Sequence, residues 1–468
     1  MNEASVAERD HAIQRLVSEL KTLLGDRCTT ADSVRSQHGH GESYHPPAPP
    51  DAVCYVQTTE EVSAVVKLCR TYRVPIIPFG AGSSLEGHVH ALYGGVCVDL
   101  SGMTKILEVH REDFDATVQA GVTRQQLNAH LRDTGLFFPV DPGAHATLAG
   151  MAATRASGTN AVRYGTMREN VISLTVVLAD GKIIRTASRA RKSSAGYDLT
   201  RLFVGSEGTL GIITELTIRL YGVPEIISAV VCSFPNVECA THAAIECIHA
   251  GVPVARVELM DDLCMRAINT YNELSYPETP TLFLEFHGTP RGVEEQAEIV
   301  REISFANGGS NWRAAANLEE RNRLWEARHK MHDAQFTLRP GAKVWGTDAC
   351  VPLSQLATCI SDIREHTQKA SFPITTLGHV GDGNFHLGFL INPDDPKEVA
   401  EAMELNSVLV RRAIALGGTC TGEHGIGYGK KQYLSLELGD GAVETMQLLK
   451  TALDPDGIFN PGKVLPDV

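Results

Sequence analysis

Two histidines frame a short turn in the second half of the chain. His379 and His386 enclose the pair Asp382-Gly383, which commonly forms a tight turn. The apolar runs 374–377 and 387–391 predict the two strands of a hairpin around that turn. The hairpin would bring the two imidazoles opposite one another at its mouth. Two neutral imidazoles in that arrangement can bind a divalent metal ion.

A third metal ligand would have to come from another segment. Glu423 and His424 offer a carboxylate and an imidazole, and Gly422 and Gly425 on either side leave room for a ligand. Two histidines, one further side chain and an open position would make a Lewis-acid site. These ligand types suit zinc, and manganese or iron would also bind them. The alternative interpretation is that the histidines form hydrogen bonds within the hairpin.

A glycine-rich loop, Gly80–Gly87, directly follows a predicted strand over 74–78. A loop without bulky side chains can present several backbone N–H groups to an anion such as a phosphate. The loop lacks the third glycine of a dinucleotide-binding G-x-G-x-x-G, because Leu85 stands there. No Walker P-loop is present either. Two further clusters rich in glycine, 139–158 and 205–211, favour a large ligand with a diphosphate over a simple turn.

Other polar residues give weaker signals. Arg328, on a predicted helix, and Lys343, after Gly341, would suit a substrate carboxylate, but a solvated surface is the simpler interpretation of both. His88 and His90 lie just beyond the first glycine loop, where a surface position is expected. No hydrolase motif is present.

Charge and cysteines restrict the class of protein. The 468 residues carry 42 Lys and Arg against 56 Asp and Glu, and the net charge of −14 disfavours nucleic acid as a partner. The 11 cysteines include no CxxC pair, which predicts free thiols in a reducing compartment.

No apolar run is long enough to span a membrane. The N-terminus has neither secretory nor transit-peptide features, so a cytoplasmic location is expected.

The pattern of apolar residues changes near Val223-Pro224. Short strands and glycine clusters precede this point, and a regular alternation of strands and helices follows it. The alternation predicts an α+β sandwich with helices on one face of a sheet. We therefore expect a domain boundary at about residue 222.

Five segments resemble the FAD-binding part of flavoproteins of the vanillyl-alcohol-oxidase or p-cresol-methylhydroxylase (PCMH) type. These segments are 78–87, 138–143, 150–165, 205–211 and 460–463. GHVGDGNFH, TCTGEHGIG and RLWEARH are similar to one branch of that family. The branch contains cytochrome-linked D-lactate dehydrogenases, D-2-hydroxyglutarate dehydrogenases and the flavin subunit of glycolate oxidase.

The resemblance implies an α+β fold with three parts. Residues 1–222 would form an N-terminal helix and a PCMH-type FAD-binding domain of two subdomains. Residues 223–424 would form an α+β, ferredoxin-like cap domain with the substrate and metal sites. Residues 425–468 would form a helical segment that returns to the FAD domain.

The resemblance also implies roles for individual residues. His379, His386 and Glu423 match metal ligands, and His424 matches the active-site base. Arg328, His332 and Lys343 match substrate-binding positions, although the 2-hydroxyglutarate branch has a small hydroxyl side chain in place of His332. Glu207, Gly208 and Ile213 would lie at the adenine side of a non-covalent FAD, and Asn460 near its isoalloxazine. The other implied FAD contacts are Pro78, Gly80, Ala81, Gly82, Ser83, Ser84, Pro142, Gly143, Gly150, Ala153, Gly158, Asn160, Tyr164 and Gly165.

The expected activity is FAD- and metal-dependent oxidation of a D-2-hydroxyacid, foremost D-lactate to pyruvate. Electrons would pass to a cytochrome, a quinone or an electron-transferring flavoprotein, at a respiratory membrane if the protein is peripheral there. A homodimer is compatible with the sequence. The alternatives are a D-2-hydroxyglutarate dehydrogenase, a glycolate oxidase subunit or, less in keeping with the histidine pair, a transferase similar to alkylglycerone-phosphate synthase.

Overall fold

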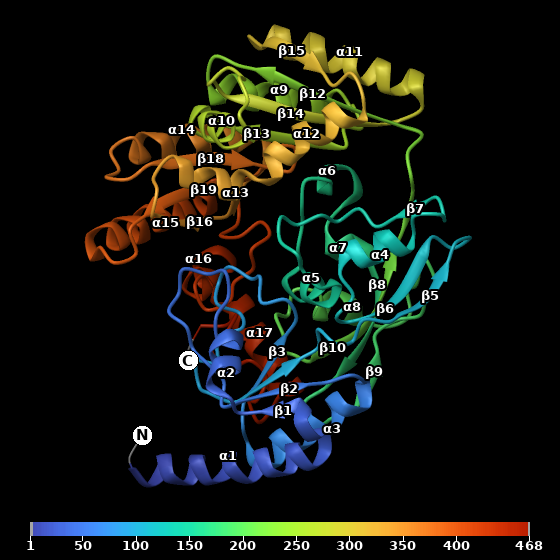
Figure 1. Ribbon diagram of the computed structural model, residues 1–468, viewed down its shortest axis with the longest axis vertical. Coiled ribbons are helices and arrows are strands. Elements are labelled where there is room, and N and C mark those ends of the chain that lie inside the picture. Colours follow the sequence, from blue (N-terminus) through green and yellow to red (C-terminus); the bar gives the residue numbers. More distant parts are fainter. Residues whose placement is uncertain (1–2, 467–468) are drawn as a thin grey trace. The chain divides into compact units, whose positions relative to one another are not determined.

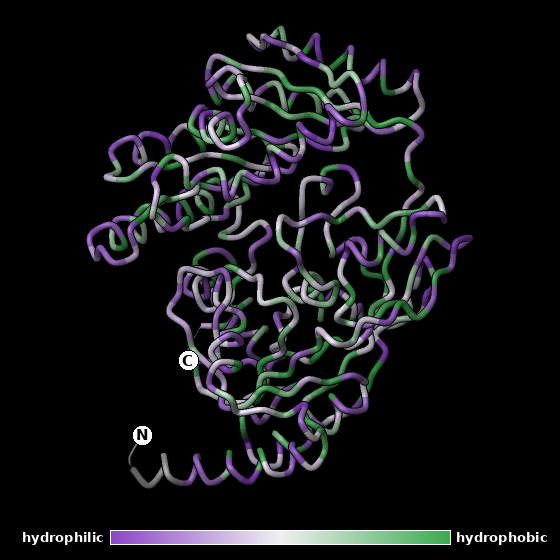
Figure 2. The backbone as a smooth tube through the Cα atoms, viewed as in Figure 1, coloured by the Kyte–Doolittle hydropathy of each residue, from purple (hydrophilic) through white to green (hydrophobic). Residues whose placement is uncertain are grey.

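The computed structural model describes residues 3–466, and the side chains from residue 8 onward; these residues form two compact units (Figure 1). Among the described residues, unit 1 comprises 3–156, 166–222 and 423–466, and unit 2 comprises 157–165 and 223–422. Each unit therefore contains a segment that is distant in sequence from the rest of it. Green, hydrophobic stretches of the tube follow the strands inside both units in Figure 2, which marks where the cores lie.

The first sheet of unit 1 is small and has a parallel centre. Its order is β1(Cys28–Thr29)-β2(Ala52–Tyr55)-β4(Val96–Asp99)-β3(Ile76–Phe79), and β2 and β3 both run parallel to β4. Helix α3 (Thr59–Tyr72) makes the crossover that parallel strands need, and the Thr58 side chain caps it by accepting from Glu61 N. Helices α1 (Glu3–Leu24) and α2 (Asp32–His38) precede β2. Strand β3 ends at Phe79, so the glycine loop begins at its carboxyl end.

The second sheet of unit 1 is antiparallel throughout. Its order is β5(Ile106–His110)-β6(Asp115–Gln119)-β10(Ile212–Arg219)-β8(Val171–Val177)-β9(Ile183–Arg185). Both sheets share one hydrophobic core. The other elements here are α4 (Arg124–His130), β7 (Leu136–Phe137), α5 (Leu148–Thr154), α7 (Met167–Asn170), α8 (Leu199–Phe203) and β11 (Tyr221–Gly222).

The C-terminal segment of the chain completes unit 1. Helices α16 (Leu434–Leu438) and α17 (Asp440–Leu453) lead back to the first sheet. There Ile76 N donates to Ile458 O at 2.7 Å, and Asn460 N donates to Ile76 O at 2.8 Å. Phe459 is fully buried between these bonds. Asn460 is thereby fixed beside β3, just before the glycine loop.

Unit 2 is built on one antiparallel sheet. Its order is β15(Ser310–Ala314)-β12(Ile226–Ser233)-β14(Thr281–Gly288)-β13(Arg256–Met260)-β18(Ile374–Gly378)-β19(Asn384–Ile391)-β16(Lys343–Gly346), and β17 (Ala349–Cys350) also pairs with β19. The remaining elements are α6 (Ala161–Tyr164), α9 (Val237–His249), α10 (Asp262–Asn272), α11 (Pro290–Ala306), α12 (Leu318–His329), α13 (Met331–Ala334), α14 (Leu356–Thr367) and α15 (Pro396–Ala415).

The expectation that helices cover only one face of this sheet is wrong. Val230 and Leu284 belong to the core that includes residues of α9, α11, α14 and α15, whereas Val231 and Phe283 belong to a core with residues of α10, α12 and α13. Successive residues of a strand point to opposite faces, so both faces are covered. The strands are accordingly buried on both sides, and a polar side chain within them needs a partner.

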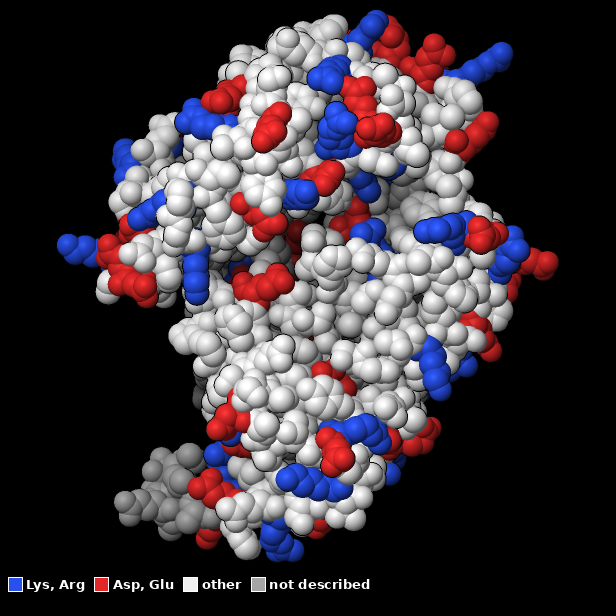
Figure 3. Space-filling model, viewed as in Figure 1, with Lys and Arg blue, Asp and Glu red and all other residues white. Residues whose placement is uncertain are grey.

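The surface carries both signs of charge. Figure 3 shows basic and acidic side chains interspersed on the visible face of each unit. Among residues 3–466, no helix combines the length and apolar character that crossing a bilayer requires.

Candidate active site

The glycine loop of unit 1 presents bare backbone. A Cβ at Gly80 would lie 2.4 Å from Thr147 Oγ1, and Gly82 has a φ of +70°. Within the described part of the chain, none of the five amides from Gly80 to Ser84 donates a hydrogen bond to another residue. The Ser84 hydroxyl is also buried without a partner there. Such a row of donors fits the diphosphate of a dinucleotide.

Other residues predicted to contact the cofactor surround this loop in unit 1. Helix α5 carries Gly150 and Ala153, and its N-cap Thr147 lies against Gly80. Pro142 and Gly143 lie in the loop before α5, and Ile213 lies in β10. A Cβ at Gly208 would come 2.8 Å from Pro78 Cγ. The fold therefore places Pro78, Gly150 and Gly208 around the glycine loop.

Glu207 and Asn460 are neighbours in unit 1. The Asn460 side chain is buried and its Nδ2 donates to Glu207 O at 2.9 Å and to His88 O at 3.1 Å. The resemblance implies opposite ends of the cofactor for these two residues, whereas the structure places them in direct contact. The Glu207 carboxylate accepts hydrogen bonds from the backbone of 426 and 427.

His88 and His90 are buried, which corrects the expected surface position. Their exposed fractions are 5% and 0%. The C-terminal segment covers them, because Asn460 binds His88 O and Lys463 Nζ donates to His90 O at 2.6 Å. Burial foremost, and then the nearby charge of groups such as Lys463, lowers the pKa of His90 to about 4.

Four residues predicted to contact the cofactor belong to unit 2 instead. Gly158, Asn160, Tyr164 and Gly165 lie in the segment 157–165. Asn160 Oδ1 accepts from Arg256 Nε at 3.0 Å, and the Tyr164 hydroxyl lies 2.7 Å from His287 Nδ1. The predicted cofactor contacts are therefore divided between the two units.

The hairpin predicted around Asp382-Gly383 is confirmed in unit 2. Strands β18 and β19 pair antiparallel with Leu377 opposite His386, and Gly383 has a φ of +78°. The ring centroids of His379 and His386 are 5.5 Å apart with nearly perpendicular planes. Both rings are nine-tenths buried, so the turn brings two imidazoles together in a site shielded from water.

Each of these imidazoles is oriented through its Nδ1 atom. His386 Nδ1 lies 3.0 Å from Thr347 O, and His379 Nδ1 lies 2.6 Å from Glu258 Oε1. A carbonyl oxygen and an ionised carboxylate can only accept, so both Nδ1 atoms donate. In the neutral rings Nε2 is then the atom with the lone pair. Metal-binding histidines are typically held in this way by their other ring nitrogen.

Glu258 is the fully buried centre of this arrangement. Arg328 donates to Glu258 Oε2 from Nε at 3.1 Å and from Nη2 at 2.6 Å. Burial raises the pKa of Glu258, but His379 and Arg328 outweigh burial and leave that pKa below its usual value. Arg328 itself is only 9% exposed, so the interpretation of Arg328 as a solvated residue is wrong.

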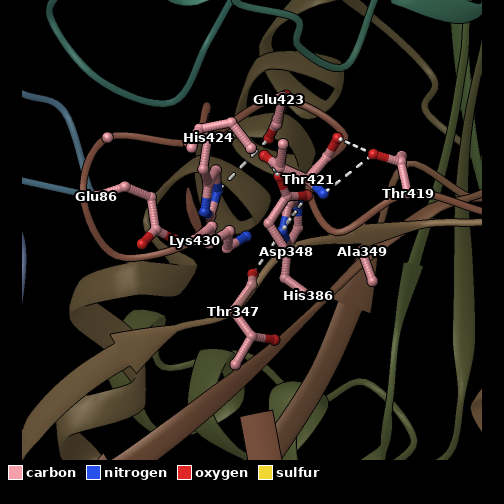
Figure 4. A network of polar contacts seen from close by, with 12 residues as sticks. Glu86, Thr347, Asp348, Ala349, His386, Thr419, Thr421, Glu423, His424 and Lys430 are labelled. Atoms are coloured by element: carbon pink, nitrogen blue, oxygen red, sulfur yellow. Dashed lines mark hydrogen bonds and ion pairs between the residues drawn. The ribbon is translucent and has the colours of Figure 1, made fainter. Parts of the chain in front are cut away.

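The segment 419–422 is linked to the same hairpin by hydrogen bonds through Asp348 (Figure 4). Asp348 accepts from Thr421 Oγ1 and from Asn384 Nδ2, both at 2.7 Å. A Cβ at Gly422 would lie 2.2 Å from Asn384 Nδ2, so only glycine fits this approach. Unit 2 ends at Gly422, and the next two residues along the chain are Glu423 and His424.

The other two residues predicted to bind substrate are not part of the buried group formed by His379, His386, Glu258 and Arg328. Lys343 is exposed at the start of β16, and His332 is exposed on α13 with its ring edge-on to Phe336. Conversely, Glu258, Thr347 and Asp348 were not predicted from the sequence. One signal existed: Glu258 is a carboxylate inside a short strand whose five residues are all buried.

Comparison with known proteins identifies the family. Residues 50–187 match the model of an FAD binding domain, and residues 223–464 match the model of the C-terminal domain of FAD linked oxidases. The chain belongs to the FAD-linked oxidase family. FAD as cofactor and the PCMH-type α+β fold are thereby confirmed, and the fit of the glycine loop to a diphosphate agrees with them. The metal stays a prediction.

Individual relatives are similar over nearly the whole chain. A probable mitochondrial D-lactate dehydrogenase of Danio rerio is 54% identical over 97% of this chain and 92% of its own length. A mitochondrial D-lactate dehydrogenase [cytochrome] of Arabidopsis thaliana is 47% identical over 97% and 80%. A crystal structure of p-cresol methylhydroxylase has a TM-score of 0.82 at 17% identity, covers 98% of both chains, and shows the shared fold.

The relatives contradict the expected cytoplasmic location. The Danio rerio and Arabidopsis thaliana proteins are both named mitochondrial. The expectation rested on the features of the N-terminal residues and on the cysteines, which are all free in the structure. Free thiols indicate only a reducing environment, and they do not distinguish one reducing compartment from another.

Proposed function

We propose that this protein oxidises D-lactate to pyruvate with FAD and a divalent metal ion. Relatives 54% and 47% identical that are named D-lactate dehydrogenases support the substrate. The structural observation that carries the chemistry is the pair His379 and His386, each oriented through Nδ1. The electron acceptor is proposed to be a respiratory one, in keeping with the word cytochrome in the Arabidopsis thaliana name.

The oxidation removes a hydride from Cα and a proton from the hydroxyl group of the substrate. FAD, when bound, supplies the acceptor for the hydride. A neutral imidazole is a suitable acceptor for the proton near pH 7, and His424 is proposed for this role.

The metal ion would bind to Nε2 of His379 and His386 and to the carboxylate of Glu423. Continuity of the chain supports the third ligand, because Glu423 directly follows Gly422, which packs against Asn384 of the hairpin. A cation there would lower the pKa of the substrate hydroxyl. The donor set of two imidazoles and one carboxylate suits zinc, and manganese or iron would also be accepted.

The substrate carboxylate needs a positively charged partner. Arg328 uses Nε and Nη2 for Glu258, and its other guanidinium donors are proposed to bind the carboxylate. Lys343 and His332, both exposed, are proposed as further contacts. Fixing the carboxylate would determine which face of Cα meets the flavin.

Anaerobic bleaching of the flavin tests this function directly. The purified yellow protein should lose its flavin absorbance on addition of D-lactate and keep it with L-lactate. Removal of the metal by a chelator should prevent the bleaching while FAD stays bound. A protein that bleaches equally with both enantiomers, or without its metal, would contradict the proposal.

A further inference from the structure

The segment after His424 has a regular pattern that the proposed function does not explain. Glycine alternates with larger residues at 425, 427 and 429, and Lys430 follows. A Cβ at Gly425 would lie 2.7 Å from both Glu207 Oε1 and His88 Nε2. A Cβ at Gly427 would lie 1.9 Å from Glu86 O. The glycines therefore allow this segment to lie directly against residues 86–88 and 207.

Glu207 binds the backbone of this segment with both carboxylate oxygens. Ile426 N donates to Oε1 at 2.7 Å, and Gly427 N donates to Oε2 at 2.8 Å. Hydrogen bonds to an ionised acceptor are about twice as strong as those between neutral groups. The two amides lie two and three residues after His424, so the carboxylate restricts the backbone that carries the imidazole.

The surroundings of Glu207 keep its carboxylate charged. Burial raises its pKa, but His88, with Nε2 3.1 Å from Oε2, and the two amides together leave the pKa below its usual value. Glu207 also has a φ of 53°, an uncommon backbone conformation for a residue other than glycine. Such strain persists where the surrounding structure enforces it, and here Asn460 binds Glu207 O.

We propose that Glu207, supported by His88, is a positioning residue for His424. This role rests on the proposed function of His424 as the base. The Glu207 carboxylate fixes the backbone at Ile426 and Gly427 and so fixes the direction in which the imidazole projects. It takes no part in proton transfer itself. Misplacing a reacting group by about 1 Å can cost about 100-fold in rate, so the expected effect is large.

Two substitutions remove the contact in different ways. Glu207→Gln keeps the size but puts an NH₂ group, which cannot accept, opposite one of the two amides. Glu207→Asp keeps the charge beside His88 but shortens the side chain. In both variants the rate of anaerobic flavin bleaching by D-lactate should fall about 10- to 100-fold, with KM changed less than kcat. FAD content should stay at the wild-type level.

Two further readouts separate positioning from general damage. In Glu207→Asp the amide protons of both Ile426 and Gly427 should exchange at least about 10-fold faster, because the shortened side chain no longer reaches them. In Glu207→Gln one of these two amides should exchange at least about 10-fold faster, because only one acceptor oxygen is left. In a His424→Gln background, Glu207→Gln should cause no further loss of bleaching rate. Unchanged exchange, a wild-type rate, losses that multiply, or loss of FAD from both variants would overturn the proposal.

The same experiment distinguishes the two failures. If His424→Gln alone bleaches normally, the proposed base is wrong, whatever the Glu207 variants do. If His424→Gln is slow but the Glu207 variants are normal, the proposed function stands and the positioning role is wrong.

Discussion

Glu207 in unit 1 and Glu258 in unit 2 are both buried carboxylates that hold a functional segment, and they do so differently. Glu258 is neutralised by two cationic or ionisable side chains, Arg328 and His379. Glu207 has one such partner, His88, and otherwise accepts from backbone amides. Glu258 therefore fixes the direction of one ring, whereas Glu207 fixes a stretch of backbone. The difference agrees with the two proposed roles, because a metal ligand would need an oriented ring and a base at a glycine-rich turn would need a restrained chain.

The largest expected effect follows from removing one of the paired imidazoles. His386→Ala should lower the rate of flavin bleaching by D-lactate about 1000-fold, because Lewis-acid assistance contributes several kcal/mol. FAD should remain bound, since the glycine loop lies in unit 1 and does not include His386. Metal analysis and stopped-flow absorbance check this. Loss of FAD together with activity would instead give the hairpin a role in binding the cofactor.

A smaller effect is expected from the charge of Glu258. Glu258→Gln can still accept from His379 Nδ1, but it leaves the Arg328 guanidinium buried without a counter-charge. We expect metal affinity to fall about 10- to 100-fold and the free energy of unfolding to fall by about 3 kcal/mol. Metal titration and urea unfolding measure the two effects.

Glu285 provides a matched control for that substitution. It is equally buried, on the neighbouring strand β14, and pairs with His287 and Arg321. Glu285→Gln should destabilise the protein similarly while leaving metal affinity unchanged. Equal losses of metal affinity in both variants would show that Glu258 acts through stability alone.

The pH dependence of stability tests the ionised state of the Glu285 carboxylate. Burial raises the pKa of Glu285, but His287, Arg256 and Arg321 outweigh burial and hold that pKa at about 2. A glutamate in the unfolded chain has a pKa of about 4.3. The stabilisation that the ionised Glu285 carboxylate provides is therefore present above that pH and is lost as the pH falls toward about 2. We expect a loss of up to about 3 kcal/mol over this window, which Glu285→Gln should lack. An identical pH profile for the variant would contradict this assignment.

Local features of the site were predictable from the sequence, and long-range ones were not. His379 and His386 flank one turn, so Asp382-Gly383 and the adjacent apolar runs were sufficient to predict their approach. Glu258 comes from a strand more than a hundred residues earlier, and no local pattern connects it to His379. His88 and His90 were expected on the surface because the segment that buries them lies at the other end of the chain.

The fold shows the same division. The hairpin of β18 and β19 followed from its turn residues, and the longer segment of unit 2 begins at Val223, where the pattern of apolar residues changes. The place of residues 157–165 in unit 2 could not be predicted in this way, because it depends on long-range contacts such as the one between Asn160 and Arg256. The helices on the second face of the sheet of unit 2 were also missed, since the runs of buried residues in its strands do not show which helices pack on which face.

The most direct test of the central claim is the reductive half-reaction of His424→Gln. The claim is that this imidazole takes the hydroxyl proton as the hydride leaves Cα. Under anaerobic conditions the variant should retain FAD and metal at wild-type levels but bleach with D-lactate at least about 100-fold more slowly. A bleaching rate close to that of the wild type would contradict the account.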